Sequence, residues 1–240
     1  MDLASPVFWL ALGQIVWINI ILSGDNAVVI ALAARSLPPA QQKKAIIWGS
    51  GAAVGLRIVL TLVAAYLLTL PYLQIVGGLL LLWIGVQLLS EEDEDEGNGK
   101  EHGTLMAAVR TILIADLVMS LDNVIAVALA AKIDGVLSYP LLIIGLAISI
   151  PMVIFGSTLM IKLMERFPII IVFGAGLIGW VAGDAITHDI ALHHVFADNK
   201  MLSYGLKIGC AIFVVALGHF LAKRSSKAHE KVTAEPKTGG

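Results

Sequence analysis

Leu22–Arg35 reads LSGDNAVVIALAAR, an apolar helical pattern that holds one carboxylate, Asp25. Met119–Lys132 reads MSLDNVIAVALAAK and holds a second carboxylate, Asp122, in the same motif. A charged side chain near the centre of a bilayer costs several kcal/mol, so an ionisable residue inside a membrane span is a functional-site hypothesis by default. The two stretches therefore indicate both membrane-spanning helices and candidate functional residues within them.

The composition indicates a membrane protein. Of 240 residues, 58% are hydrophobic and 14% are charged, and the mean hydropathy is +0.88. A membrane-spanning helix needs about 20 apolar residues. We therefore predict an all-α polytopic membrane protein with about seven spans, at roughly 7–34, 44–69, 71–90, 104–132, 138–163, 168–188 and 202–223. The first span has no cleavage-site pattern, so we expect it to be retained rather than removed as a signal peptide.

The sequence repeats itself at an offset of 97 residues. Between 19–87 and 116–184, 15 of 69 positions are identical, among them the Asp-Asn pairs at 25–26 and 122–123. Each unit holds three spans, and an odd number makes the second unit enter the membrane from the opposite side. Such inverted repeats place substrate sites near the midplane. Helix packing alone would account for shared small residues but not for paired carboxylates.

The repeat and the distribution of charge predict how the chain is organised. We expect a first three-helix repeat at 1–90, an acidic cytoplasmic linker at 91–103, a second, inverted repeat at 104–188, an outer loop and seventh helix at 189–223, and a disordered cytoplasmic tail at 224–240. With the amino terminus outside, the inner segments hold twelve lysines and arginines and the outer segments three. This bias predicts a multi-pass plasma (inner) membrane protein with a cytoplasmic carboxyl terminus.

Helical spacing collects oxygen ligands from both repeats. The first and fourth helices carry matching stripes at i, i+4 and i+7: Asn19, Ser23 and Asn26, and Asp116, Ser120 and Asn123. Asp25 and Asp122 would turn inward if the helices unwound locally, which Gly24 favours and Leu121 does not. Carboxylate and amide oxygens suit hard divalent cations such as Mn²⁺, Mg²⁺ or Ca²⁺. A hydrogen-bonded polar core with protonated aspartates and a metal-free proton relay are the alternatives.

Two further charged residues have open roles. Arg57 is the basic residue well inside a span, and Ile154 takes its place in the second repeat. It either pairs with a site carboxylate when the ion is absent or serves as a structural ion-pair partner. Asp184 aligns with Gln87 toward the outer end of the sixth span. It is either an additional carboxylate of the site or its exit, or an ordinary interfacial residue.

The loops add two weaker signals. Glu91–Gly103, EEDEDEGNGKEHG, reads as a solvated acidic tether that would also concentrate cations near the cytoplasmic entrance. Thr187–Lys200, THDIALHHVFADNK, reads as a polar outer loop, with transfer of metal to an exported protein as the alternative. Cys210 is the single cysteine, which excludes an intramolecular disulfide and a thiolate metal cluster. The absence of a nucleotide-binding glycine loop argues against direct use of ATP.

At the paired motifs the chain strongly resembles the TerC family of integral membrane proteins, and more narrowly its YjbE-type subgroup of metal transporters. The match rests on NIILSGDNAVVIALAA and DLVMSLDNVIAVALAA and extends over nearly the whole membrane part. The family is similar in fold class to LysE-type exporters and is associated with manganese efflux, with supply of manganese to exported enzymes and, in some branches, with tellurite resistance. The resemblance implies that the ion is bound by Asp25, Asn26, Asp122 and Asn123, with Asn19 and Asp116 alongside.

Residues and resemblance together predict an exporter of a divalent cation, Mn²⁺ above all, by secondary transport and alternating access. Mn²⁺ is the transported substrate, protons are the expected counter-ion, and membrane lipid surrounds the protein. The alternatives are a non-transporting scaffold that supplies metal to exported proteins, with secretion machinery as its partner, and an exporter of small organic solutes. We expect no enzymatic activity, no permanently bound cofactor and no nucleic-acid partner. The oligomeric state stays open.

Overall fold

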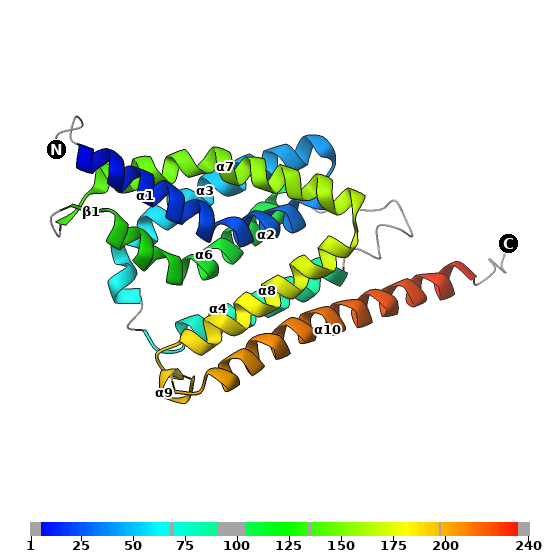
Figure 1. The fold of residues 1–240 in the computed structure, drawn as a ribbon. Helices are drawn as coiled ribbons and strands as arrows, with labels where there is room; N and C mark the ends of the chain where they lie inside the picture. The colour runs from blue at the N-terminus through cyan, green and yellow to red at the C-terminus, as the bar shows by residue number, and fades with distance from the viewer. Residues whose placement is uncertain (1–5, 68–69, 91–103, 134–135, 197, 235–240) are drawn as a thin grey trace.

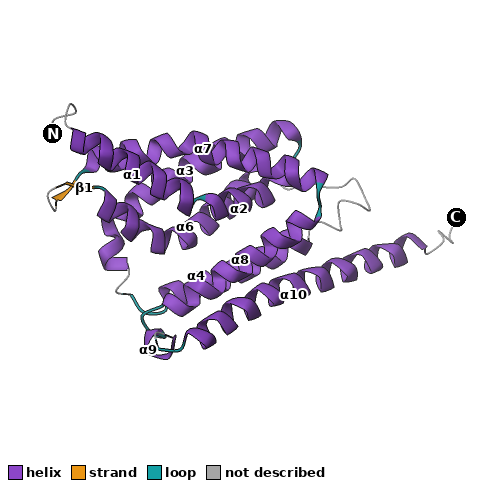
Figure 2. Cartoon of the chain, in the orientation of Figure 1, coloured by secondary structure: helices purple, strands orange, loops and turns teal. Residues whose placement is uncertain are grey.

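The computed structural model describes residues 6–67, 70–90, 104–133, 136–196 and 198–234, and nearly all of them are helical (Figures 1 and 2). The helices are α1 (Pro6–Leu22), α2 (Gly24–Arg35), α3 (Pro39–Leu67), α4 (Leu73–Ser90), α6 (Leu105–Ala130), α7 (Tyr139–Arg166), α8 (Ile169–His188), α9 (His193–Phe196) and α10 (Lys200–Ala234). Two short antiparallel strands, β1 (Lys132–Ile133) and β2 (Val136–Leu137), form a hairpin between α6 and α7. The acidic linker 91–103 lies outside the described residues.

The helices have the length and composition of membrane spans. Among the described residues, α3, α4, α7, α8 and α10 are long and apolar enough to cross a membrane. The pair α1 and α2 passes the same test together and is bent by 50°, so it adds a sixth span if it is one broken helix. The all-α polytopic architecture is thus confirmed. The count of seven stays a prediction, because α6 is 26 residues long but is not one of these spans.

Two groups of helices make up the molecule. In Figure 1, α1, α2, α3, α6 and α7 form one group, and α4, α8 and α10 run side by side in the other. Helix α3 packs on α6, and the pair α1 and α2 packs on α7, which is the same contact with the two repeats exchanged. Helices α4 and α8 pack on each other. Units related by a two-fold axis would produce this pattern, although the inverted repeat itself stays a prediction.

Glycines at corresponding positions let the two groups approach closely. A Cβ atom on Gly77 of α4 would come within 2.8 Å of Val118 on α6. At the aligned position in α8, a Cβ atom on Gly174 would come within 3.0 Å of Val28 on α2. Small residues of this kind are what close packing of membrane helices requires. The contacts bring α4 and α8 against the helices that carry the two Asp-Asn motifs.

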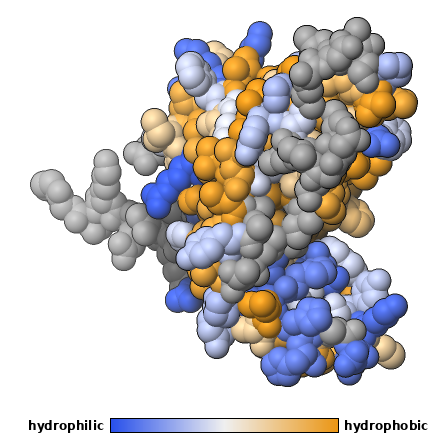
Figure 3. Space-filling view, turned by 90° about the vertical axis from the view of Figure 1, so that its left-hand side faces the viewer, coloured by the Kyte–Doolittle hydropathy of each residue, from blue (hydrophilic) through white to orange (hydrophobic). Residues whose placement is uncertain are grey.

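The two ends of the described chain lie far apart (Figure 1). The start of α1 and the end of α10 lie at opposite ends (Figure 1), as they would if the termini faced opposite sides of a membrane. Figure 3 views the end near α1, where hydrophilic residues gather on the lower part, at the height of α9 in Figure 1, and hydrophobic ones cover much of the rest. Which end faces the cytoplasm stays a prediction.

Helix α10 differs from the expected tail. It continues to Ala234, whereas the sequence predicts disorder from residue 224. The segment from 224 to 234 reads RSSKAHEKVTA and lacks glycine and proline, and its lysine, alanine and glutamate residues favour helix. Residues 235–240 of the expected tail lie outside the described part of the chain.

Candidate functional site

The predicted break in the first span is present. Helix α1 ends at Leu22 and α2 begins at Gly24, and the two axes differ by 50°. The N–H of Ser23, between them, donates to the Ile20 carbonyl at 3.4 Å. Gly24 is not required by crowding, because an added Cβ atom would meet nothing within 4 Å, but its low helix propensity favours an interruption there. Helix α6, by contrast, runs unbroken through the second motif.

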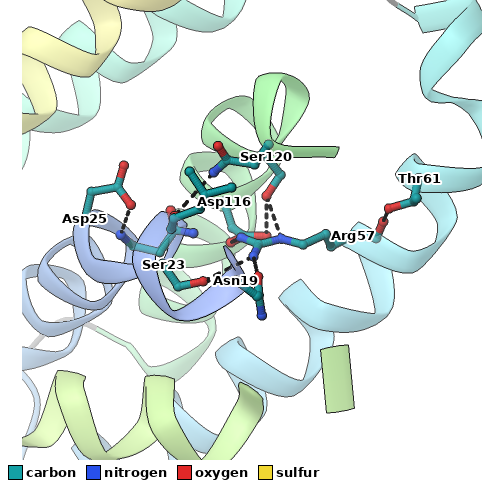
Figure 4. Close-up of polar contacts among 10 residues, drawn as sticks. Asn19, Ser23, Asp25, Arg57, Thr61, Asp116 and Ser120 are labelled. Carbon is teal, nitrogen blue, oxygen red and sulfur yellow. Dashed lines mark hydrogen bonds and ion pairs between the residues drawn. The ribbon is translucent and has the colours of Figure 1, made fainter. Parts of the chain in front are cut away.

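Arg57 of α3 is the centre of a buried network of hydrogen bonds (Figure 4). Its Nη2 lies 2.6 Å from Asp116 Oδ1, and its Nε donates to Ser120 Oγ at 3.0 Å, both on α6. Its Nη1 donates to Asn19 Oδ1 at 2.7 Å and to Ser23 Oγ at 3.3 Å, at the end of α1. The guanidinium, with Arg57 only 3% exposed, therefore joins the break in the first span to α6.

The two polar stripes have matching internal hydrogen bonds. Ser23 Oγ donates to Asn19 Oδ1 at 3.3 Å, and Ser120 Oγ donates to Asp116 Oδ2 at 3.2 Å. Each bond joins residues four positions apart, as the spacing predicts. The polar stripes of the two repeats therefore face each other, and the Arg57 guanidinium lies between them and binds both.

The two Asp-Asn pairs have different surroundings. Asp25 Oδ1 accepts the N–H of Asn26 at 2.8 Å, and Asp25 lies on the other side of Ser23 from Arg57 (Figure 4). Asn26 is 2% exposed, and neither its Oδ1 nor its Nδ2 has a hydrogen-bond partner among the side chains and backbone that the structure describes. Asn123 Nδ2, in the second motif, donates to the Leu22 carbonyl at 3.3 Å. An unsatisfied buried polar group costs about 1–3 kcal/mol, so the Asn26 amide is a group in need of a ligand.

The predicted ligands are therefore only partly assembled. Asp122 lies in α6, but its side chain is outside the described part of the structure. The described residues contain no group of three or more histidines, cysteines, aspartates or glutamates that could hold a metal ion. The Asn26 amide and the neighbouring Asp25 carboxylate have oxygen atoms that could bind a hard cation. The side-chain oxygens of Asp116 and Asn19 instead accept hydrogen bonds from Arg57.

Asp184 has its partners elsewhere. It forms an ion pair with Lys207 of α10, and one of its oxygens lies 3.5 Å from His188 Nδ1. The Lys207 ammonium in turn lies 5.9 Å from the ring centroid of Trp180 and 5.4 Å from that of Tyr204. These contacts tie α8 to α10 and favour the interfacial role for Asp184.

Asp189 has a structural role that sequence reasoning missed. Its side chain accepts the backbone N–H groups of Tyr72 at 2.9 Å, Gln74 at 3.0 Å and Ile75 at 3.3 Å, at the start of α4, and that of Ala191 at 2.8 Å. Burial raises the pKa of Asp189, but the four N–H donors outweigh it and hold the pKa below its ordinary value. The carboxylate links positions about 115 residues apart, so no local pattern indicates it.

Comparison with known proteins identifies the family. The model of the TerC family of integral membrane proteins matches residues 4–226. The chain belongs to the TerC family. Within it, the chain is 44% identical over 208 residues to the uncharacterized membrane protein YjbE of Bacillus subtilis, which covers 87% of this chain and 93% of that protein. The resemblance seen at the two motifs is thus confirmed.

More distant relatives of the chain include longer proteins. The uncharacterized membrane protein YceF of Bacillus subtilis is 27% identical over 208 residues, which cover 81% of this chain and 78% of that protein. The inner membrane protein YoaE of Escherichia coli is 28% identical over 189 residues, which cover 71% of this chain but only 36% of YoaE. No solved structure matches the chain.

Proposed function

We propose that this TerC-family protein is a secondary transporter that carries a divalent cation, Mn²⁺ above all, out of the cytoplasm. The observation that carries the proposal is the break between α1 and α2, with Asp25 in the first turn after it and the buried Asn26 amide without a partner. Broken helices in transporters use such interruptions to coordinate ions at the midplane.

The balance of charge supports a divalent cargo. The Arg57 guanidinium pairs with Asp116, so the charges of these two residues cancel. Asp25 and Asp122 are then the carboxylates of the paired motifs that remain, and together they would neutralise one divalent ion. Their oxygens, with the amides of Asn26 and Asn123, are hard ligands that suit Mn²⁺, Mg²⁺ or Ca²⁺ better than zinc or copper. The association of the family with manganese favours Mn²⁺ among them.

The proposed cycle uses alternating access. Mn²⁺ enters from the cytoplasmic side, binds between α2 and α6, and is released outside when the two repeats rock around it. Protonation of the aspartates on the outer side aids release, which makes the protein a proton antiporter. The relative YoaE is named an inner membrane protein, and we propose the same membrane for this chain, with the amino terminus outside. The proposal includes no enzymatic activity.

The test is Mn²⁺ flux in proteoliposomes that contain the full chain. We expect wild type to move Mn²⁺, and Asp25→Asn and Asp122→Asn each to abolish the movement. Asp184→Asn is the matched control, because it removes a carboxylate whose partners lie on α8 and α10. Mg²⁺, Ca²⁺ and Zn²⁺ serve as competitors, and an imposed pH gradient should change the rate.

Each of the other functions has its own outcome. If wild type binds Mn²⁺ but does not move it across the membrane, the scaffold function would replace the transporter function. Neither binding nor movement of any of these cations would leave organic solutes, a proton relay or helix packing to explain the carboxylates. If the transport rate does not depend on the pH gradient, proton coupling would be excluded, whereas cation transport would not.

A further inference from the structure

The acceptors around Arg57 form a cage of oxygen atoms that both repeats supply. One side is Asn19 Oδ1 and Ser23 Oγ, and the other is Asp116 Oδ1 and Ser120 Oγ, all within 3.3 Å of a guanidinium nitrogen. Carboxylate, amide and hydroxyl oxygens are also the ligands that a hard metal cation takes. The cage therefore suits a cation, and in this structure the cation is the side chain of Arg57.

The cage breaks the symmetry of the repeats in two matched places. Asn19 of the first repeat aligns with Asp116 of the second, so the second repeat has one more negative charge. Arg57 of the first repeat aligns with Ile154 of the second, so the first repeat has one more positive charge. The two extra charges meet in the ion pair between Arg57 and Asp116. This ion pair joins one repeat to the other. It therefore lies at the interface across which the two repeats would move during transport.

We infer that Arg57 is a tethered stand-in for the transported cation: its guanidinium fills the Asn19, Ser23, Asp116 and Ser120 cage in the empty carrier and yields it when the cargo binds. This inference rests on the proposed function and adds the means by which the empty carrier returns. A carrier must cross between its two states without cargo in every cycle of net transport. Protons neutralise Asp25 and Asp122 in the proposed cycle. A bare buried Asp116 carboxylate would still oppose the return step, and the Arg57 guanidinium neutralises it.

The consequence is a difference between two modes of transport. Net efflux requires the return of the empty carrier and therefore needs Arg57. Exchange of Mn²⁺ for Mn²⁺ uses only loaded carriers, in which Arg57 has already yielded the cage to the cargo, and therefore does not need Arg57. The ratio of net flux to exchange flux isolates this step, because misfolded or poorly reconstituted protein lowers both fluxes together.

The experiment measures both fluxes with radioactive Mn²⁺ in proteoliposomes. In Arg57→Gln we expect the ratio of net to exchange flux to fall at least about tenfold, since the empty carrier can no longer cover Asp116. Arg57→Lys keeps a charge and should retain part of the net flux. In the double variant Arg57→Gln with Asp116→Asn, the carboxylate that Arg57 neutralises is removed together with Arg57, and the ratio should return to within about twofold of wild type. Arg110→Gln, an exposed arginine on α6, is the control and should leave the ratio unchanged.

Three outcomes would overturn the inference. If Arg57→Gln lowers both fluxes by the same factor, or lowers neither, Arg57 is a structural ion-pair partner. If the double variant keeps the low ratio of Arg57→Gln, the bare carboxylate is not what opposes the return. Both results leave Mn²⁺ transport by wild type intact. If wild type moves no Mn²⁺ in either mode, the proposed function fails, and the stand-in role fails with it.

Discussion

The two copies of the Asp-Asn motif have nearly the same sequence and different structures. In the first, the helix is broken at Ser23, and the buried Asn26 amide has no hydrogen-bond partner in the described part of the chain. In the second, α6 is continuous, and Asn123 donates to the Leu22 carbonyl at the break. The break in the first repeat thus supplies a backbone acceptor that the second repeat uses, whereas α6 supplies side-chain acceptors, Asp116 and Ser120, to Arg57 of the first repeat. The site is therefore asymmetric, because the first-span helix is broken within its motif and α6 is continuous.

The largest expected effect comes from the charge pair that crosses between the repeats. Asp116→Asn leaves the Arg57 charge buried without its counter-ion, and removal of one partner from a buried ion pair costs about 3–5 kcal/mol of folding free energy. We expect a lower midpoint in denaturant or thermal unfolding of the protein in detergent. Combining it with Arg57→Ile, the residue type of the second repeat, should recover most of the loss.

The control for this prediction is the ion pair between Asp184 and Lys207. Asp184 is partly exposed, so screening by solvent limits its pairing with Lys207, and Asp184→Asn should cost at most about 1 kcal/mol. Equal losses for Asp116→Asn and Asp184→Asn would mean that the Arg57 network does not hold the repeats together.

The second effect concerns Asp189, which joins the end of α8 to the start of α4 and so connects the two repeats at one end. Asp189→Asn should cost about 1–2 kcal/mol, in the range of a lost helix cap. Because the pKa of Asp189 is lowered in the folded state, its contribution is present above the unfolded pKa of about 3.9 and is lost as the pH falls through the folded pKa. Unfolding midpoints measured from pH 7 downward should therefore converge for wild type and variant in acid. Curves that stay parallel would show that the carboxylate charge is not what stabilises this contact.

The third prediction is that equivalent substitutions in the two motifs change the free energy of unfolding in opposite directions. Asn26→Leu removes an amide that has no partner and should raise the free energy of unfolding by about 1 kcal/mol in metal-free detergent. Asn123→Leu removes a hydrogen bond to Leu22 and should lower it by a similar amount. The measurement is the pair of unfolding midpoints in the presence of a chelator. Changes of the same sign would contradict the described asymmetry.

The smallest effect on stability is expected at Gly24. Gly24→Ala adds a methyl group that meets nothing within 4 Å and changes the helix propensity by about 1 kcal/mol in favour of a continuous helix. We expect a stability change below about 1 kcal/mol but slower Mn²⁺ flux in proteoliposomes, because the open conformation of the first span is disfavoured. Unchanged flux would show that the break does not depend on glycine.

Local patterns in the sequence predict those features of the structure that are determined by residues close together in the chain. Hydrophobic length and the spacing of Asn19 and Ser23 indicate the helices and the polar stripe, and Gly24 indicates the break. The repeat offset makes Asp116 the counterpart of Asn19, and the two side chains do meet at the Arg57 guanidinium. Arg57 stands out because a charge inside a span must find a partner, although the sequence alone leaves two kinds of partner open.

Long-range contacts leave no such signal. The bonds from Asp189 to the start of α4 and the pairing of Asp184 with Lys207 join different helices, and neither produces a periodicity in the sequence. The continuation of α10 to Ala234 depends on helix propensity in a polar segment whose charges favour disorder.

We propose that the paired motifs bind one divalent cation. Titration of metal-free protein in nanodiscs with Mn²⁺, followed by the loss of the free-ion electron paramagnetic resonance signal, tests it directly. Wild type and Asp184→Asn should each bind one Mn²⁺ per chain, and Asp25→Asn should bind none at the same concentrations. Binding by Asp25→Asn equal to that of wild type, or none by wild type, would contradict the account.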